Sequence, residues 1–362
     1  MAFPDKPTAH LLGSNGPVHA VAYSASPGTY ILTGSADRTI RLYNPSPSTS
    51  TSVPERGRAS KAVPQGRLIQ TYAAHGYEVL SVDVAADNER FVSAGGDRAV
   101  FLWDVSAAVT TRRFGGTAQG HSARINCVCF AGEGDSLVVS GGFDTTARVW
   151  DVRSRSLKPV QVLDEARDAV TAVAVRGPEL VTGSVDGRVR SYDVRMGRCT
   201  TDVLGACVTS LGLTRDGRAA LVGSLDSRVR LMDRDTGACL RAYSAPGFRN
   251  EELRIQSVLG ARERYVVAGD EMAAGGGDDA DAHGSGSGRI WAWDLVTGAL
   301  AASIEVPWGP GGHEPKRRVV GKDGREKARS NIVSCMAWRD GGWGDEFCAG
   351  GTSGVVTVFG AS

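Results

Sequence analysis

A short phrase recurs along this chain at intervals of about 40 to 66 residues, and this repetition restricts the fold more than any other feature. Each copy has a glycine-rich step, a turn residue that is often Asp, and an alternating segment that ends in a large side chain. The seven copies end at Tyr43, Trp103, Trp150, Tyr192, Met232, Trp293 and Phe359. The shortest interval exceeds the roughly 33–34 residues of the common helical repeats, so the pattern argues against them.

Within each copy hydrophobic and polar residues alternate, and β-branched and aromatic residues are frequent, which is typical of short antiparallel strands. In three successive copies the pattern predicts first strands at 79–84, 125–130 and 170–175, and second strands at 91–94, 137–140 and 180–183. A lone four-stranded sheet of this size cannot bury both faces, but seven packed radially can. We therefore predict one all-β domain over residues 1–362, a seven-bladed β-propeller with four antiparallel strands in each blade.

Three long intervals between copies contain insertions of biased composition. Residues 45–66 are rich in Ser, Pro and Thr, residues 270–288 are acidic, and residues 307–329 are basic. Such compositions are typical of disordered surface segments. Binding of RNA or an acidic partner by the basic insertion, or of a cation by the acidic one, remains an alternative, but neither has a recognisable site pattern.

Overall charge and cysteine content narrow the class of protein. The formal net charge is +1, so no global field favours nucleic acid or an anionic membrane, and we expect no sequence-specific nucleic-acid binding. No stretch near Met1 reads as a secretion signal, and no apolar run is long enough to span a membrane. The seven cysteines include no C-x-x-C pair. We expect location in the cytoplasm and nucleus.

The Trp-Asp pairs at 103–104, 150–151 and 293–294 give the chain a clear resemblance to the WD-repeat β-propellers. The resemblance implies a hydrogen-bonded set of His, Ser or Thr, Asp and Trp in each blade, because a buried Asp and His need partners. Two copies match fully, with His75, Ser93, Asp97, Trp103 and with His121, Ser140, Asp144, Trp150. The resemblance also implies that residues near Thr8–Leu12 supply the last strand and close the ring.

The same residue types could suggest a nucleophilic triad of His75, Ser93 and Asp97. The trio recurs one repeat later beside another Trp, which favours a structural role. No His pair has metal-ligand spacing, and the paired acids of the 270–288 insertion lack an apolar wall. We therefore expect that the protein is not an enzyme and has no metal site and no cofactor.

A propeller without catalytic groups presents its loops to partners, so we predict a binding rim just before the first strands. The rim candidates are Tyr77, Glu78, Arg124, Asp168 and Arg254. Tyr and Arg are enriched in the residues that dominate binding energy at protein interfaces. An ordinary propeller also carries some such residues, so the individual positions remain hypotheses.

Beyond the general fold, several stretches resemble the mitogen-activated protein kinase organizer family of WD-repeat proteins, and two parts of them, Leu163–Asp168 and Asp193–Gly197, lie outside the repeat consensus. They include His75–Leu80, Pro159–Val170, Gly183–Gly197 and Ser224–Gly237. The resemblance implies a non-enzymatic scaffold for kinase-cascade components, also associated with the spliceosome in pre-mRNA splicing, and we expect a monomer within larger complexes. The alternative is a substrate receptor of a cullin-4 ubiquitin ligase, because Trp150–Arg153 and Tyr192–Arg195 resemble the W-D-x-R box that binds the ligase adaptor. Arg153 and Arg195 are the candidate box residues.

Overall fold

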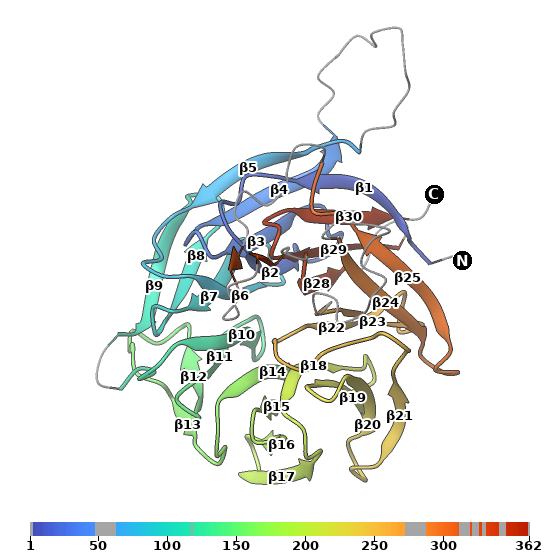
Figure 1. Ribbon diagram of the computed structural model, residues 1–362. Coiled ribbons are helices and arrows are strands. Elements are labelled where there is room, and N and C mark those ends of the chain that lie inside the picture. The colour runs from blue at the N-terminus through green and yellow to red at the C-terminus, as the bar shows by residue number, and fades with distance from the viewer. Residues whose placement is uncertain are drawn as a thin grey trace, which may run out of the picture.

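The computed structural model describes residues 3–47, 63–116, 119–271, 287–310, 319–320, 326–327, 331–339 and 345–360. Over these residues the chain forms seven four-stranded antiparallel sheets and one two-stranded hairpin. The sheets are arranged as blades around a central channel (Figure 1), which confirms the seven-bladed propeller. No helix in the described part of the chain is long and apolar enough to cross a membrane.

The blades are numbered here along the chain. The innermost strands are β2 (Val18–Tyr23), β6 (Val79–Val84), β10 (Ile125–Ala131), β14 (Val170–Arg176), β18 (Val208–Leu213), β22 (Ser257–Gly260) and β28 (Val333–Trp338). The second strands are β3 (Ile31–Ser35), β7 (Arg90–Gly95), β11 (Leu137–Gly142), β15 (Glu179–Ser184), β19 (Ala219–Ser224), β23 (Tyr265–Gly269) and β29 (Glu346–Gly351).

The third strands, which carry the repeated aromatic phrase, are β4 (Ile40–Pro47), β8 (Ala99–Asp104), β12 (Ala147–Asp151), β16 (Arg188–Asp193), β20 (Arg228–Asp233), β24 (Gly288–Asp294) and β30 (Val356–Gly360). The outer strands of blades 1 to 6 are β5 (Gly66–Tyr72), β9 (Val109–Gly115), β13 (Gln161–Leu163), β17 (Arg198–Val203), β21 (Cys239–Tyr243) and β25 (Leu300–Val306). The separate hairpin joins β26 (Val319–Val320) and β27 (Glu326–Lys327).

The N-terminal strand β1 (Lys6–Leu11) closes the ring as the outer strand of blade 7, as predicted. It pairs antiparallel with β30, with Leu11 opposite Val356, and the described ends of the chain lie close together (Figure 1). The side chains of Ala9 and Leu11 are buried, and the Tyr43 hydroxyl donates to the carbonyl of Leu12 at 2.8 Å. Closure therefore joins blades 7 and 1 through both backbone pairing and apolar packing.

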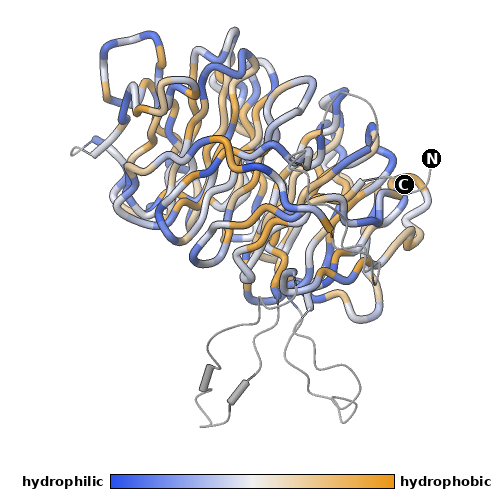
Figure 2. Tube along the Cα trace, turned by 90° about the horizontal axis from the view of Figure 1, so that it is seen from above, coloured by the Kyte–Doolittle hydropathy of each residue, from blue (hydrophilic) through white to orange (hydrophobic). Residues whose placement is uncertain are grey.

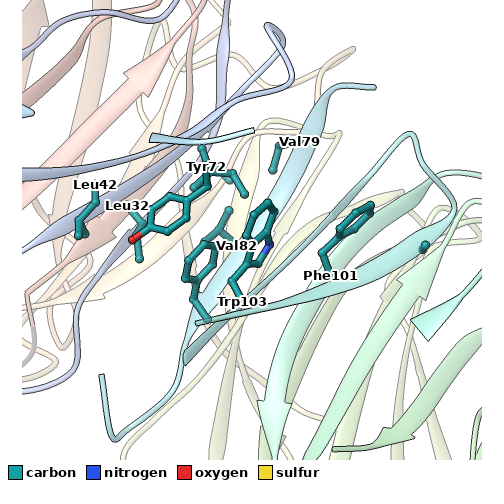
Figure 3. Close-up of a cluster of buried hydrophobic side chains, with 11 residues drawn as sticks. Leu32, Leu42, Tyr72, Val79, Val82, Phe101 and Trp103 are labelled. Carbon is teal, nitrogen blue, oxygen red and sulfur yellow. The ribbon is translucent and has the colours of Figure 1, made fainter. Parts of the chain in front are cut away.

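The hydrophobic core lies between neighbouring blades, and the tube coloured by hydropathy shows apolar strands inside and polar loops outside (Figure 2). Between blades 1 and 2, Leu32, Leu42 and Tyr72 pack against Val82 and Trp103 (Figure 3). The Tyr72 and Trp103 rings are 5.7 Å apart and meet edge to face, a favourable arrangement. Each blade thus depends on its neighbour to bury its faces.

Polar side chains join the innermost strands across the channel wall. The amide of Asn126 donates to the carbonyl of Val170 at 2.8 Å, and the Thr171 hydroxyl donates to Val208 at 2.6 Å. The Asp83 carboxylate accepts the backbone N–H of Phe130 at 2.7 Å, so a blade 2 side chain satisfies a blade 3 donor. The innermost strands of neighbouring blades are too far apart to pair with each other through their backbones. Side chains therefore satisfy backbone N–H and C=O groups that face the neighbouring blade.

Candidate interaction faces

Blade 2 holds its predicted polar residues in one continuous hydrogen-bonded set. The Trp103 indole N–H donates to Ser93 Oγ at 2.8 Å, and Ser93 Oγ lies 2.7 Å from His75 Nε2. His75 Nδ1 lies 2.6 Å from an Asp97 carboxylate oxygen. Because the indole can only donate, the serine hydrogen points to Nε2 and the histidine donates from Nδ1 to Asp97.

Blade 3 repeats this arrangement with His121, Ser140, Asp144 and Trp150. Burial alone would raise the pKa of the Asp144 carboxyl, but hydrogen bonds from His121 and the backbone N–H of Ser122 hold it well below its usual range. In blade 2, hydrogen bonds from His75 and the backbone N–H of Gly76 likewise outweigh burial and lower the pKa of Asp97. The duplicated trio is therefore a buried brace, in which every polar member has a partner within the blade.

Blades 1, 4 and 5 brace the same turn with a set that sequence reasoning missed. In blade 4, Arg190 donates to Asp186 at 2.7 Å and to Ser184 Oγ at 2.9 Å, and the serine hydroxyl also donates to Asp186. The corresponding sets are Ser35, Asp37, Arg41 in blade 1 and Ser224, Asp226, Arg230 in blade 5. The sequence signal was a serine two residues before the turn Asp and an arginine four residues after it.

In blades 1 and 4, the second-strand hydroxyl that corresponds to Ser93 and Ser140 is not part of the arginine set. Among the described residues, the buried hydroxyls of Thr33 and Thr182 make no hydrogen bond, although they occupy the place of Ser93 and Ser140. Their blades have Tyr43 and Tyr192 where blades 2 and 3 have Trp, so no indole donor reaches them.

Blade 6 uses a further variant that corrects the sequence interpretation of Asp270. Asp270 was assigned to the acidic insertion, yet it is 1% exposed and accepts the Trp291 indole N–H at 2.8 Å. Glu271 accepts the backbone N–H groups of Glu252 and Leu253. The remaining acids of that insertion, Asp278, Asp279 and Asp281, lie outside the described residues.

The braced turns and the predicted rim lie at the same end of the strands. In six blades the residue just before the first strand accepts a backbone N–H from the turn between the second and third strands. These acceptors are Pro17, Glu78, Arg124, Ala169, Cys207 and Ile332. We call this surface the rim face, and the surface at the other end of the strands the opposite face.

On the rim face, aromatic side chains lie beside basic ones. The Tyr77 side chain is 64% exposed and packs against Gly96, where an added Cβ would come within 2.6 Å of it. The Arg124 guanidinium lies 5.0 Å above the Phe143 ring, which is 52% exposed. Exposed aromatic groups stabilised by a cation are the kind of side chains that dominate protein interfaces.

At the mouth of the channel, Arg254 reaches across the ring to donate to the carbonyl of Asn126 at 2.7 Å. Burial in the channel and the nearby Arg124 lower its pKa, and within the described residues no carboxylate pairs with it. His19 lies 3.8 Å from Glu78, and burial lowers the pKa of this histidine. The mouth thus presents a cation whose charge no carboxylate among the described residues neutralises.

The structure brings only some of the predicted rim residues together. Arg124 and Arg254 are close enough for their charges to interact. Glu78 lies near the same channel mouth, where its carboxylate is 3.8 Å from His19 Nε2. Asp168 is exposed on the rim face, where its carboxylate accepts the N–H of Ala169 at 2.6 Å. Sequence reasoning missed Phe143 and His19, because the role of each depends on a contact with a residue distant in sequence.

The candidate adaptor-box residues, Arg153 and Arg195, lie on the opposite face. Both are exposed and follow a third strand, where Asp151 and Asp193 accept the backbone N–H of the respective arginine at 2.8 and 2.9 Å. Asp104, Asp233 and Asp294 form the same turn in other blades. The Asp of the box therefore has a structural reason to be present, and only the arginines are special to blades 3 and 4.

No cluster of three or more His, Cys, Asp or Glu side chains in the described part of the chain could hold a metal ion. Of the insertions 45–66, 270–288 and 307–329, most residues lie outside the described ranges. The Ser46-Pro47 step lies at the end of β4, whereas most of the basic residues of 307–329 are among the residues outside these ranges. The predictions made for these insertions therefore remain predictions.

A family model described as "WD domain, G-beta repeat" matches residues 5–44, 66–104, 112–151 and 157–193. Each match begins in or before an outer strand and ends with a third strand, so the sequence repeat is offset from the blade by one strand. This offset explains why β1 belongs to blade 7.

Curated relatives match over most of the chain. WD repeat domain-containing protein 83 of Rattus norvegicus is 38% identical over 316 residues, covering 84% of this chain and 87% of the relative. The Homo sapiens protein of the same name is 39% identical over 303 residues, covering 84% and 83%. The Dictyostelium discoideum homolog is 28% identical over 289 residues, covering 72% and 81%. The chain belongs to the WD-repeat family that includes WD repeat domain-containing protein 83.

Proposed function

We propose that this chain is a non-enzymatic scaffold that assembles protein complexes, with components of a mitogen-activated kinase cascade, splicing factors, or both as its partners. The observation that carries the proposal is the rim face, where Tyr77, Phe143 and Arg124 are exposed around an Arg254 that lacks a carboxylate partner among the described residues. The family relationship supports it, because WD-repeat propellers commonly act as binding platforms.

The hydrogen-bonded set in blade 2 also supports a non-enzymatic role. His75, Ser93 and Asp97 use their hydrogen-bonding capacity on one another and on Trp103, so the buried Ser93 hydroxyl is not positioned to attack a substrate. The proposed location is the cytoplasm and nucleus, where both kinds of partner occur.

Native pull-down with mass spectrometry tests the proposal. The bait is the wild-type chain, with a rim variant that combines Tyr77→Ala and Arg254→Glu and a control variant, Val203→Ala, at an exposed outer-strand position. We expect kinases or splicing factors with the wild type and the control, and their loss with the rim variant. Equal recovery by all three baits would contradict a rim-mediated scaffold.

A second candidate function is the substrate receptor of a cullin-4 ligase, and the exposure of both box arginines on one face favours testing it. Arg153→Ala combined with Arg195→Glu should abolish recovery of the ligase adaptor if the boxes bind it. On the scaffold proposal, the same double variant keeps its kinases or splicing factors. The two proposals therefore predict different losses from the same pull-down.

A further inference from the structure

A cavity of about 480 Å³ opens between blades 3 and 4 on the opposite face, away from the rim. Its walls are apolar, with Val139 and Val149 from blade 3 and Val175, Leu180 and Val194 from blade 4. The volume lies within the range of roughly 300–1,000 Å³ that is usual for ligand pockets. We call this cavity the 3/4 groove.

The groove exists because of the side chain at one register position. Val175 pairs with Leu180, which in turn pairs with Tyr192, the last aromatic of the blade 4 repeat. The residues at this position in the other blades are Tyr23, Val84, Phe130, Leu213, Leu259 and Trp338. Each packs toward the preceding blade.

Cavities of comparable size open beside the two valines of this set. Besides the 3/4 groove, a cavity of about 420 Å³ lies between blades 1 and 2, next to Val84. Phe130 occupies the matching space between blades 2 and 3, where it packs against Val92 and Leu102. A valine too small to fill the space between blades therefore explains both openings.

The 3/4 groove differs from the other opening at its outer end. In blade 1 the seven-residue outer strand β5 contributes Ile69 and Gln70 to the cavity wall. In blade 3 the outer strand β13 has three residues, and none of them lines the 3/4 groove. The chain just before it exposes Val160, which is 67% exposed and donates its N–H to Val149. The groove is thus open to a chain approaching from the side.

The charged side chains at the groove mouth differ in whether they have an ion-pair partner. Glu179 is paired with Arg234 at 2.9 Å, whereas the Arg195 guanidinium has no partner among the described residues. Glu133 stands on the blade 3 side of the mouth. A bound acid is therefore favoured on the blade 4 side, next to Arg195.

We propose that the 3/4 groove binds a short peptide segment of a partner protein, with a large apolar side chain in the cavity and an Asp or Glu paired with Arg195. The apolar anchor removes from water the surface of Val175, which is partly exposed, and of Val194, which is 44% exposed, and the acid sets the orientation of the segment. This site is separate from the rim face and does not depend on which complexes the rim assembles.

Selection of a phage-displayed library of random 12-residue peptides on the full chain tests the proposal. We expect enriched peptides to share one Leu, Phe or Trp at a fixed spacing from an Asp or Glu. In fluorescence polarisation, Val175→Phe should weaken the enriched peptide at least tenfold, because it reproduces the filled state of Phe130. The matched control Val84→Phe fills the cavity between blades 1 and 2 and should leave binding unchanged.

Charge reversal supplies a second, surface variant that leaves the core intact. Arg195→Glu should weaken the acidic peptide at least tenfold, and a peptide with Lys in place of the acid should regain affinity for that variant. Val175→Phe keeps Arg153 and Arg195, so recovery of a ligase adaptor is a separate readout. Enrichment of no peptide, binding that survives Val175→Phe, or affinity indifferent to Arg195 would overturn the proposal.

Discussion

Blades 2 and 3 and blades 1, 4 and 5 build the same four-stranded sheet but brace its rim turn differently. The first pair connects His, Ser, Asp and Trp through the interior of the blade, and the His121 side chain is fully buried. The others clamp Asp with Ser and Arg, and their exposure differs, since the Asp186 side chain in blade 4 is 9% exposed and the Asp226 side chain in blade 5 is 31% exposed. One turn geometry can therefore be held by a His-Ser-Asp-Trp set or by a Ser-Asp-Arg clamp, and the buried set of blade 3 and the partly exposed clamp of blade 5 should differ in energy.

The largest expected difference follows from removing the turn Asp of each kind of set. Asp144→Ala leaves His121, Ser140 and the Trp150 indole without their buried anchor, so we expect a loss of about 3 kcal/mol in the free energy of unfolding. Asp226→Ala removes a partly exposed ion pair and should cost about 1 kcal/mol. Urea denaturation of both variants measures the difference. Equal losses would show that the braces are energetically equivalent.

The arginine clamps should also respond to acid. Burial alone would raise the pKa of Asp186, but hydrogen bonds from Arg190 and Ser184 hold it at about 2. Because this pKa lies below the unfolded value, the clamp stabilises the fold above pH 4 and loses that stabilisation as the pH falls toward 2. Asp186→Asn should cost about 1.5 kcal/mol at pH 7, after allowance for solvent screening, and this cost should shrink as the pH falls through 2. A cost independent of pH would contradict the assigned pKa.

Asp83, in the channel wall, gives the opposite pH dependence. Burial raises its pKa to about 6, despite the hydrogen bond that it accepts from Phe130. A raised pKa means that stabilisation is complete below pH 4 and is lost as the pH rises through 6. Asp83→Asn should therefore stabilise the chain by roughly 1 kcal/mol at pH 8 and have no effect at pH 4. Ser81→Ala, which removes a neighbouring bond to Val128, is the control and should be independent of pH over this range.

The smallest effect distinguishes bonded from unbonded hydroxyls at one position. Thr182→Val replaces a buried hydroxyl that has no partner among the described residues, so we expect a gain of roughly 0.5 kcal/mol. Ser140→Ala at the equivalent position should cost roughly 1 kcal/mol, because it removes the partner of both Trp150 and His121. Thermal melts of the two variants should shift in opposite directions. A shift in the same direction would mean that the Thr182 hydroxyl has a partner in solution.

The fold could be predicted because the same local sequence pattern occurs in seven copies along the chain. Alternation, turn residues and period are local properties, and they located the first strand of blade 2 at 79–84, which is β6. The closing strand was expected near Thr8–Leu12 and is β1, Lys6–Leu11. Errors remained where one copy departs from the others, as at Asp270, which looked like part of an acidic insertion but bonds to Trp291.

The interaction surfaces were only partly predictable, because they depend on contacts between blades. The strand alignment placed Arg124 and Arg254 on the rim, but the reach of Arg254 to Asn126 joins residues 128 positions apart. The 3/4 groove depends on the size of Val175 relative to residues at the same register in other blades, which becomes meaningful only once the strands are paired. Local sequence patterns do not contain this information.

Hydrogen exchange on the chain, alone and in its purified native complex, tests most directly whether the rim face is the binding surface. We predict that the complex slows exchange in the rim segments around Tyr77–Glu78, Arg124 and Phe143, while the outer strands of the blades exchange at the same rate in both samples. Protection confined to the outer strands, with the rim unchanged, would contradict the account.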